Sequence, residues 1–189
     1  MRAVMLAAAA LAVTALPALA QQRNGEFVQL SPPEGWQPAP TMRTDKTSVT
    51  RLFPPGQSEK DWTETLAVQV LTGSDQMARP YVEGVIAYSR ANCDSAAPGP
   101  VTEATRNGYP SATVQVACSK GKATGLGGFI LVTAIRGKDA LYVIQRQWRG
   151  PAFEPNERPA IPQDTLRQWG AFSQGVSLCD TRDPRHPCR

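Results

Sequence analysis

Four cysteines and a single histidine are the residues of this chain whose chemistry would be most specific. The thiols of Cys93, Cys118, Cys179 and Cys188 could hold a metal ion, act as nucleophiles or pair as disulfides. Structural zinc sites commonly use closely spaced pairs such as Cys-x-x-Cys, and that spacing does not occur here. His186 lies between Cys179 and Cys188, where it is poorly placed to complete a site. The spacing therefore predicts no metal centre.

The first twenty residues predict the compartment in which these thiols will lie. A basic second residue precedes an apolar run over residues 4–16, and Ala18-Leu19-Ala20 gives the small-x-small pattern that signal peptidase cleaves. We therefore expect a signal peptide over residues 1–20, with cleavage between Ala20 and Gln21. The run is too short to span a membrane, which takes about 20 apolar residues. The expected product is a soluble periplasmic or secreted protein without a membrane span.

In an oxidising compartment, an even number of cysteines favours disulfides over free thiols. Four cysteines allow three pairings, and the spacing favours Cys93 with Cys118 and Cys179 with Cys188. The second pair closes a short segment whose two prolines make it turn back. Loop closure gives the first bridge about 3.5 kcal/mol of stabilisation and the second about 2.7 kcal/mol. We predict two disulfides and no cysteine nucleophile.

The serines and the acidic residues offer two further catalytic arrangements to consider. A hydrolytic triad in an α/β-hydrolase needs a Gly-x-Ser-x-Gly turn, which the chain lacks. Paired carboxylates can cleave glycosidic bonds, and the candidates are Glu59, Asp61 and Glu64 at a strand entrance and Glu154 and Glu157 in a loop. A solvated surface position is the simpler interpretation of each. A carboxylate-dependent envelope hydrolase is therefore the alternative function.

The glycine-rich segment at residues 121–128, GKATGLGG, superficially suggests a phosphate-binding loop. It lacks Gly-Lys-Ser/Thr at the required end, and a strand pattern follows it where such a loop would open a helix. We predict a flexible connection between two strands, which can still form the edge of a binding site. No cofactor is expected.

Arg146 and Trp148 are the best candidates for contact with a ligand or partner. They lie two residues apart on one face of a predicted strand, with Gln145 and Gln147 on the other face. An arginine and a tryptophan so placed could stack on an aromatic or anionic ligand. The preferred alternative is a core tryptophan beside an arginine whose charged end reaches the margin of the sheet.

The overall charge argues against a nucleic-acid partner. The formal net charge is +4, and the arginines are scattered singly along the chain, whereas nucleic-acid-binding proteins usually concentrate basic residues on one face. The expected partner is a protein or another component of the cell envelope.

Two periodicities divide the rest of the chain into strands and helices. Alternation of apolar and polar residues is clearest over residues 63–71. Helical spacing follows Asp75, a suitable N-cap, and ends near residues 92–93; a second helix spans residues 163–174. The predicted strands are residues 26–30, 47–53, 63–71, 101–106, 109–119, 126–136 and 140–149. Residues 95–100 and 151–162 are predicted loops.

Asn107-Gly108 is a strong two-residue hairpin signal between two of these strands. Hairpins with few helices indicate an α+β fold, with an antiparallel sheet of about six strands flanked by helices. Residues 21–189 are expected to form one such domain with a disulfide-stapled C-terminal tail. This order of elements, with Trp62-Thr63-Glu64 opening a strand after a Pro-Gly turn, resembles the PsbP-like fold. The resemblance implies the fold and no particular activity.

These inferences favour a non-enzymatic, exported domain that binds a protein or an envelope component. The carboxylate hydrolase and a small-ligand carrier are the alternatives.

Overall fold

Two hairpins form the middle of a large antiparallel sheet. A computed structural model describes residues 24–188, so the expected signal peptide and its cleavage site at Ala20 and Gln21 lie outside the described residues. The hairpin strands are β7 (Thr102–Arg106), β8 (Tyr109–Cys118), β9 (Gly127–Arg136) and β10 (Ala140–Gly150). Asn107 and Gly108 join β7 to β8 with φ angles of 49° and 84°. This left-handed pair is what a two-residue hairpin turn of this type requires.

The main sheet has nine strands in the order β2-β4-β5-β10-β9-β8-β6, with β3 also paired to β4 and β7 to β8. Its other strands are β2 (Gln37–Pro38), β3 (Met42–Arg43), β4 (Thr47–Phe53), β5 (Glu64–Thr72) and β6 (Ala96–Pro98). Every pair is antiparallel. Six strands have five or more residues, as the sequence predicts. The prediction of a single α+β domain is confirmed.

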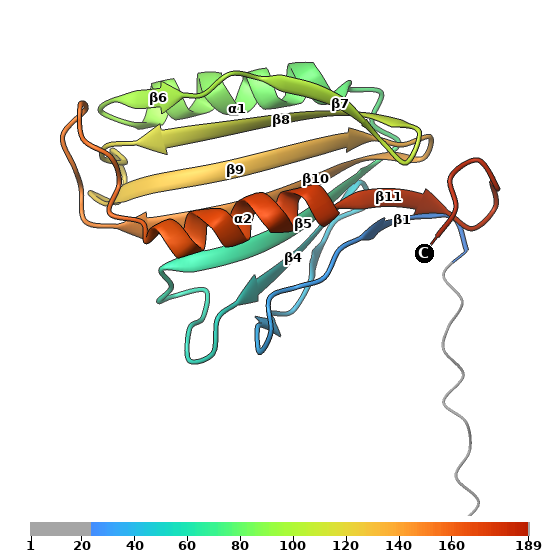
Figure 1. Ribbon diagram of the computed structural model, residues 1–189, viewed down its shortest axis with the longest axis horizontal. Helices are drawn as coiled ribbons and strands as arrows, with labels where there is room; N and C mark the ends of the chain where they lie inside the picture. The colour runs from blue at the N-terminus through green and yellow to red at the C-terminus, as the bar shows by residue number, and fades with distance from the viewer. Residues whose placement is uncertain (1–23, 189) are drawn as a thin grey trace, which may run out of the picture.

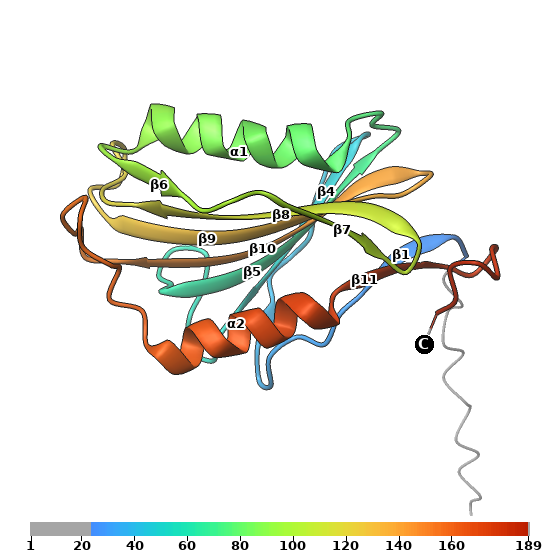
Figure 2. The same cartoon turned by 45° about the horizontal axis from the view of Figure 1, so that its top comes forward.

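One helix covers each face of this sheet. α1 (Ala78–Asn92) lies over β8 and β9, and α2 (Gln163–Gly175) lies on the opposite side (Figures 1 and 2). Val82 of α1 is fully buried against the sheet together with Val143 of β10, and Trp169 of α2 is buried on the other face. The central strands are therefore covered on both faces, which explains their long apolar runs. Within the described residues, no helix is long and apolar enough to cross a membrane.

The start of α1 differs from the prediction. The N-cap is Met77, without a side-chain cap, and Asp75 lies before the helix. Ser74 forms the local bond instead, since its hydroxyl accepts from the backbone N–H of Gln76 at 3.2 Å. Pro80 lies in the first turn, where a helix tolerates the missing N–H.

Four of the described strands lie where the sequence predicts none: the two-residue strands β2 and β3, and the longer β6 and β11. β6 falls in the predicted loop at residues 95–100, and Ala96 pairs there with Cys118 of β8. β11 (Ser177–Asp180) pairs antiparallel with β1 (Glu26–Gln29) in a separate two-stranded sheet (Figure 1). Both β6 and β11 are too short to show a period, and each depends on a partner that is distant in the chain.

Both predicted disulfides are present. Cys93 and Cys118, with Cα atoms 5.6 Å apart, join the end of α1 to the end of β8. Cys179 and Cys188, with Cα atoms 5.1 Å apart, close the loop that follows β11. The described residues contain no free cysteine.

Candidate functional site

Arg146, one of the two predicted ligand contacts, lies inside the core beneath α2. Its side chain is 3% exposed, and its Nη2 donates a hydrogen bond to Oε2 of Glu64 at 3.1 Å. The indole N–H of Trp169 donates to the same oxygen at 3.1 Å. Burial lowers the pKa of Arg146, and the charge of Glu64 opposes this shift. One carboxylate therefore serves two buried donors.

Aromatic rings enclose the guanidinium group of Arg146. Its carbon lies 4.7, 5.0 and 5.3 Å from the ring centroids of Trp36, Trp169 and Phe172, within the range of cation–π attraction. Trp148, the second predicted contact, is buried in the same layer. These contacts are internal to the chain, so contact of either residue with a ligand stays a prediction. Period-two reasoning places Arg146 and Trp148 on one face but has no signal for Trp36, which comes from a proline-rich loop.

The candidate carboxylates have separate roles in the structure. Glu59 lies 3.8 Å from Arg51 in a partly exposed pair, and Glu64 belongs to the buried network. Oε2 of Glu157 accepts the backbone N–H of Glu154 at 3.3 Å. These partners account for Glu59, Glu64 and Glu157 as structural or solvated groups.

His186 packs against the start of β8. Its ring stacks on Tyr109 with centroids 4.0 Å apart, and its Nδ1 lies 2.8 Å from the carbonyl oxygen of Asn107. Nδ1–H is the donor in that bond, because a carbonyl can only accept. The histidine therefore docks the disulfide-closed loop onto the turn before Tyr109.

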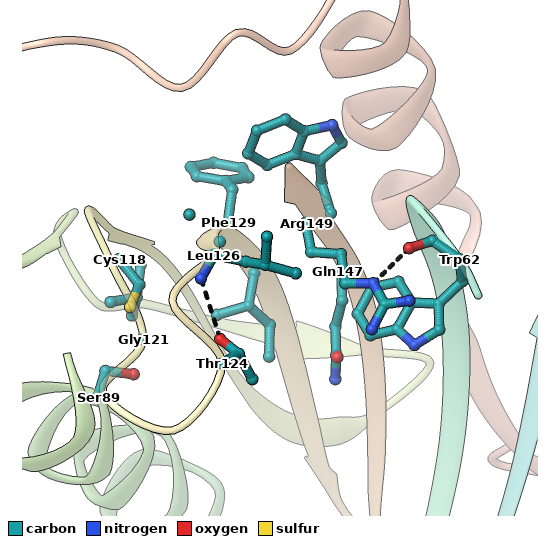
Figure 3. A pocket seen from close by; sticks show the side chains of 14 residues that line it. Trp62, Ser89, Cys118, Gly121, Thr124, Leu126, Phe129, Gln147 and Arg149 are labelled. Atoms are coloured by element: carbon teal, nitrogen blue, oxygen red, sulfur yellow. Dashed lines mark hydrogen bonds between the residues drawn. The ribbon is translucent and has the colours of Figure 1, made fainter. Parts of the chain in front are cut away.

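A groove runs beside α1, over the part of the sheet that this helix leaves uncovered. Two adjoining hollows of about 510 and 240 Å³ share Ser89, Ile130 and Gln147. In Figure 3, Ser89 and Trp62 lie on opposite sides of the smaller hollow, with Gln147 between them. We call this feature the amide groove and define it by Tyr81 and Ser89 of α1, Gln145 and Gln147 of β10, and Trp62 and Arg149 at one end.

Amide and hydroxyl groups form the floor of the amide groove. Gln145 and Gln147 lie on the α1 side because β10 alternates its side chains, and Nε2 of Gln147 donates to Oε1 of Gln145 at 2.7 Å. The hydroxyl of Tyr81 donates to Oε1 of Gln69 at 3.2 Å. Burial raises the pKa of Tyr81, which keeps it a neutral donor. Oε1 of Gln147 bonds no other described residue, so it is available as an acceptor.

One end of the amide groove is closed by a fixed arginine and an aromatic ring. The guanidinium carbon of Arg149 lies 4.4 Å from the ring centroid of Trp62. Arg149 also donates to the backbone oxygens of Trp62 and, at 3.2 Å, of Lys60. The loop that opens β5 therefore holds this cation at the groove. Sequence reasoning missed it, because nothing in the pattern of β10 indicates what Arg149 contacts.

The glycine-rich segment at residues 121–128 connects β8 to β9, as predicted. The backbone N–H of Thr124 donates to the carbonyl oxygen of Gly121 at 3.2 Å. The backbone N–H of Gly121 donates to the carbonyl oxygen of Leu126 at 2.8 Å. Thr124 and Leu126 lie beside the smaller hollow (Figure 3). This connection forms an edge of the amide groove.

Comparison with known proteins places the chain in a fold class. No protein family matches the sequence, and no curated protein matches it. Among solved structures, the architecture resembles the Mog1/PsbP-like fold. A mutant of the protein Mog1 is similar, with a TM-score of 0.50 and 17% identity over 85% of this chain and 98% of that one. The Saccharomyces cerevisiae Ran-binding protein Mog1p has the same TM-score and identity, over 84% and 97%.

Proposed function

We propose that the chain is an exported binding domain that recognises a component of the cell envelope through the amide groove. The observation that carries this proposal is the row of glutamine amides between Tyr81 on one side and Trp62 and Arg149 at the end. These are groups for binding and orienting a ligand. Two disulfides support export, because such bonds persist in oxidising compartments.

The chemistry of the groove favours a hydroxyl- and amide-rich chain, such as a glycan strand of the envelope. The bond between the two glutamines uses one N–H of Gln147 and the oxygen of Gln145. The other amide groups leave N–H donors and the oxygen of Gln147, which match a ligand that carries both kinds of group. Tyr81 and Trp62 add an apolar surface with a polar edge, suited to the C–H faces of sugar rings. Pockets of this kind fix a ligand with a few well-placed polar groups.

The similar structures add a precedent for binding. One of them is named a Ran-binding protein, so the same architecture supports recognition of a partner elsewhere. At 17% identity the likeness shows the fold alone, and what this chain binds depends on the residues of its own site.

The experiment that tests the proposal measures binding of the mature chain, residues 21–189 with both disulfides formed, to purified peptidoglycan and its soluble glycan strands. Co-sedimentation gives the fraction bound, and calorimetry gives the affinity for the soluble strands. Gln147→Ala should weaken binding about three- to tenfold, since a hydrogen bond contributes roughly 0.5–1.5 kcal/mol.

The matched control is Gln168→Ala, an exposed amide on α2, which should bind as the parent chain does. Equal binding by Gln147→Ala and the parent would overturn the proposal, as would the absence of saturable binding. Release of soluble fragments from the glycan would favour the carboxylate hydrolase instead.

A further inference from the structure

A second cleft lies on the opposite face of the sheet, between α2 and the neighbouring strands. It has a volume of about 700 Å³, within the range of sites that hold small organic ligands. Phe129 and Leu131 of β9 lie along it, and the loop before α2 closes it. We call it the α2 cleft and define it by Phe129, Leu131, Arg158, Ile161, Leu166 and Arg167.

The interior of the α2 cleft is mainly apolar, with Gln115 and Gln163 as its uncharged polar lining residues. Leu131 and Ile161 are buried around it, Phe129 is half-buried, and Leu166 of α2 is 40% exposed. The exposed surface of Leu166 is not covered by the chain's own core. A hydrocarbon group in the cleft would remove this surface from water, which is favourable in proportion to the area covered.

The charged lining residues of the α2 cleft are both arginines. Arg158 is exposed and makes no ion pair or hydrogen bond with any other described residue. Arg167 pairs with Asp164, but both side chains are more than 70% exposed, at 72% and 74%, so solvent weakens that pair. The margin of the cleft therefore carries one arginine that has no ion pair among the described residues and one that is only weakly paired, and this positive charge attracts anions.

We propose that the α2 cleft binds a single-chain amphiphile with an acidic head, either a carboxylate or a phosphate. The hydrocarbon chain lies against Phe129, Leu131 and Leu166, and the head group pairs with Arg158. Burial of the chain supplies most of the affinity. The exposed arginine contributes less, but it decides which head group is preferred.

This site adjoins the amide groove at Phe129, which lines both, and the two share no other lining residue. The glutamines of the amide groove lie on the face of the sheet opposite the α2 cleft, because Gln147 and its neighbour Trp148 point to opposite sides of β10. Absence of glycan binding would therefore not contradict the proposal for the α2 cleft. Gln147→Ala should not alter the binding of an amphiphile.

The test titrates the mature chain with decanoate, decyl phosphate and decyltrimethylammonium, each below its critical micelle concentration, by calorimetry. One anionic amphiphile should bind at a single saturable site, about three- to fivefold more tightly than the cation, as an exposed charge pair allows. Tighter binding of decanoate assigns a fatty-acid ligand, and tighter binding of decyl phosphate assigns a phospholipid-type head. Either result supports the proposal.

Two variants and one control locate the site. Arg158→Gln should remove the preference for the anion without abolishing binding, because Arg158 makes no ion pair or hydrogen bond with another described residue. Leu166→Gln should weaken binding of all three amphiphiles. Arg90→Gln changes an exposed arginine on α1, on the other face, and should change nothing. Absence of saturable binding, equal affinity for the cation, or an unchanged preference in Arg158→Gln would each overturn the proposal.

Discussion

Glu64 and Arg146 are joined by a hydrogen bond of 3.1 Å between neighbouring strands, on the face that α2 covers. Because Trp169 donates to the same carboxylate oxygen, this pair also anchors the helix to the sheet. The side chain of Glu64 is 23% exposed, whereas that of Arg146 is 3% exposed. The arginine thus depends on a partner that lies closer to solvent than itself.

Replacing Glu64 with alanine should destabilise the protein strongly. The change leaves Arg146 charged, buried and without its carboxylate, and it leaves the indole N–H of Trp169 without an acceptor. Breaking a fully buried pair costs about 3–5 kcal/mol, and partial exposure of Glu64 reduces the expected loss to about 2–3 kcal/mol. Urea denaturation gives the free energy of unfolding.

Glu59→Ala is the matched control for this change. Glu59 pairs with Arg51 at 3.8 Å, with both side chains more than 40% exposed, at 50% and 42%. Its loss should cost less than about 1 kcal/mol. Equal losses for the two variants would show that the buried pair contributes little.

The disulfide between Cys93 and Cys118 should contribute more to stability than the one between Cys179 and Cys188. It closes the longer loop, with a sequence separation of 25 against 9, so it restricts the unfolded chain more. Replacing both cysteines of a pair with serine should lower the free energy of unfolding by about 3.5 kcal/mol for the first and about 2.7 kcal/mol for the second. Denaturant titration of the two double variants gives both values.

Peptide mapping without reduction checks the pairing itself. It should recover Cys93 linked to Cys118 and Cys179 linked to Cys188. Recovery of four free thiols from the protein, purified under oxidising conditions, would contradict the prediction.

Protonation of Asp183 should weaken the C-terminal loop in acid. Arg185 and Lys138 bind this carboxylate and hold its pKa well below the ordinary value of 3.8. Because the pKa of Asp183 is lower in the folded state, its charge stabilises the fold fully when the pH is above the pKa that it has in the unfolded chain. This stabilisation is lost as the pH falls toward the pKa of Asp183 in the folded state. The parent chain should therefore exceed Asp183→Asn in stability most clearly above about pH 4, and less as the pH approaches about 2.

Denaturant unfolding of the parent chain and of Asp183→Asn, from about pH 7 to about pH 2, measures the difference between their free energies of unfolding. Asp180 also has a lowered pKa, but it titrates in both chains and cancels in the comparison. A difference that stays constant across this range would show that Asp183 acts through packing alone.

The sequence predicts the fold where the signals are local. Alternation identifies β5 and β10, Asn107-Gly108 identifies its hairpin, and helical spacing identifies α1 and α2. The prediction misses β2, β3, β6 and β11, because each is too short to show a period and is held in the sheet only by its partner strand. The pairing of Cys93 with Cys118 succeeds because two local features, the end of a helix and the core face of a strand, lead to the same residues.

The candidate sites depend on contacts that no local pattern contains. The alternation along β10 correctly places Arg146 and Trp148 on one face and Gln145 and Gln147 on the other. From the sequence, however, the predicted ligand contacts are Arg146 and Trp148. The structure shows that pair in the core, with Trp36 and Glu64 arriving from other parts of the chain. The glutamines, which the sequence treats as the opposite face only, lie in an open groove.

The alternation of side chains along β10 makes this strand a shared boundary between two different surfaces. A one-residue insertion within it would reverse the two sides beyond the insertion point, turning Gln147 toward α2 and Trp148 toward α1. Both surfaces and the core would be lost together. Changes in length among descendants of this chain should therefore accumulate in the connections at residues 119–126 and 151–162 and spare β10.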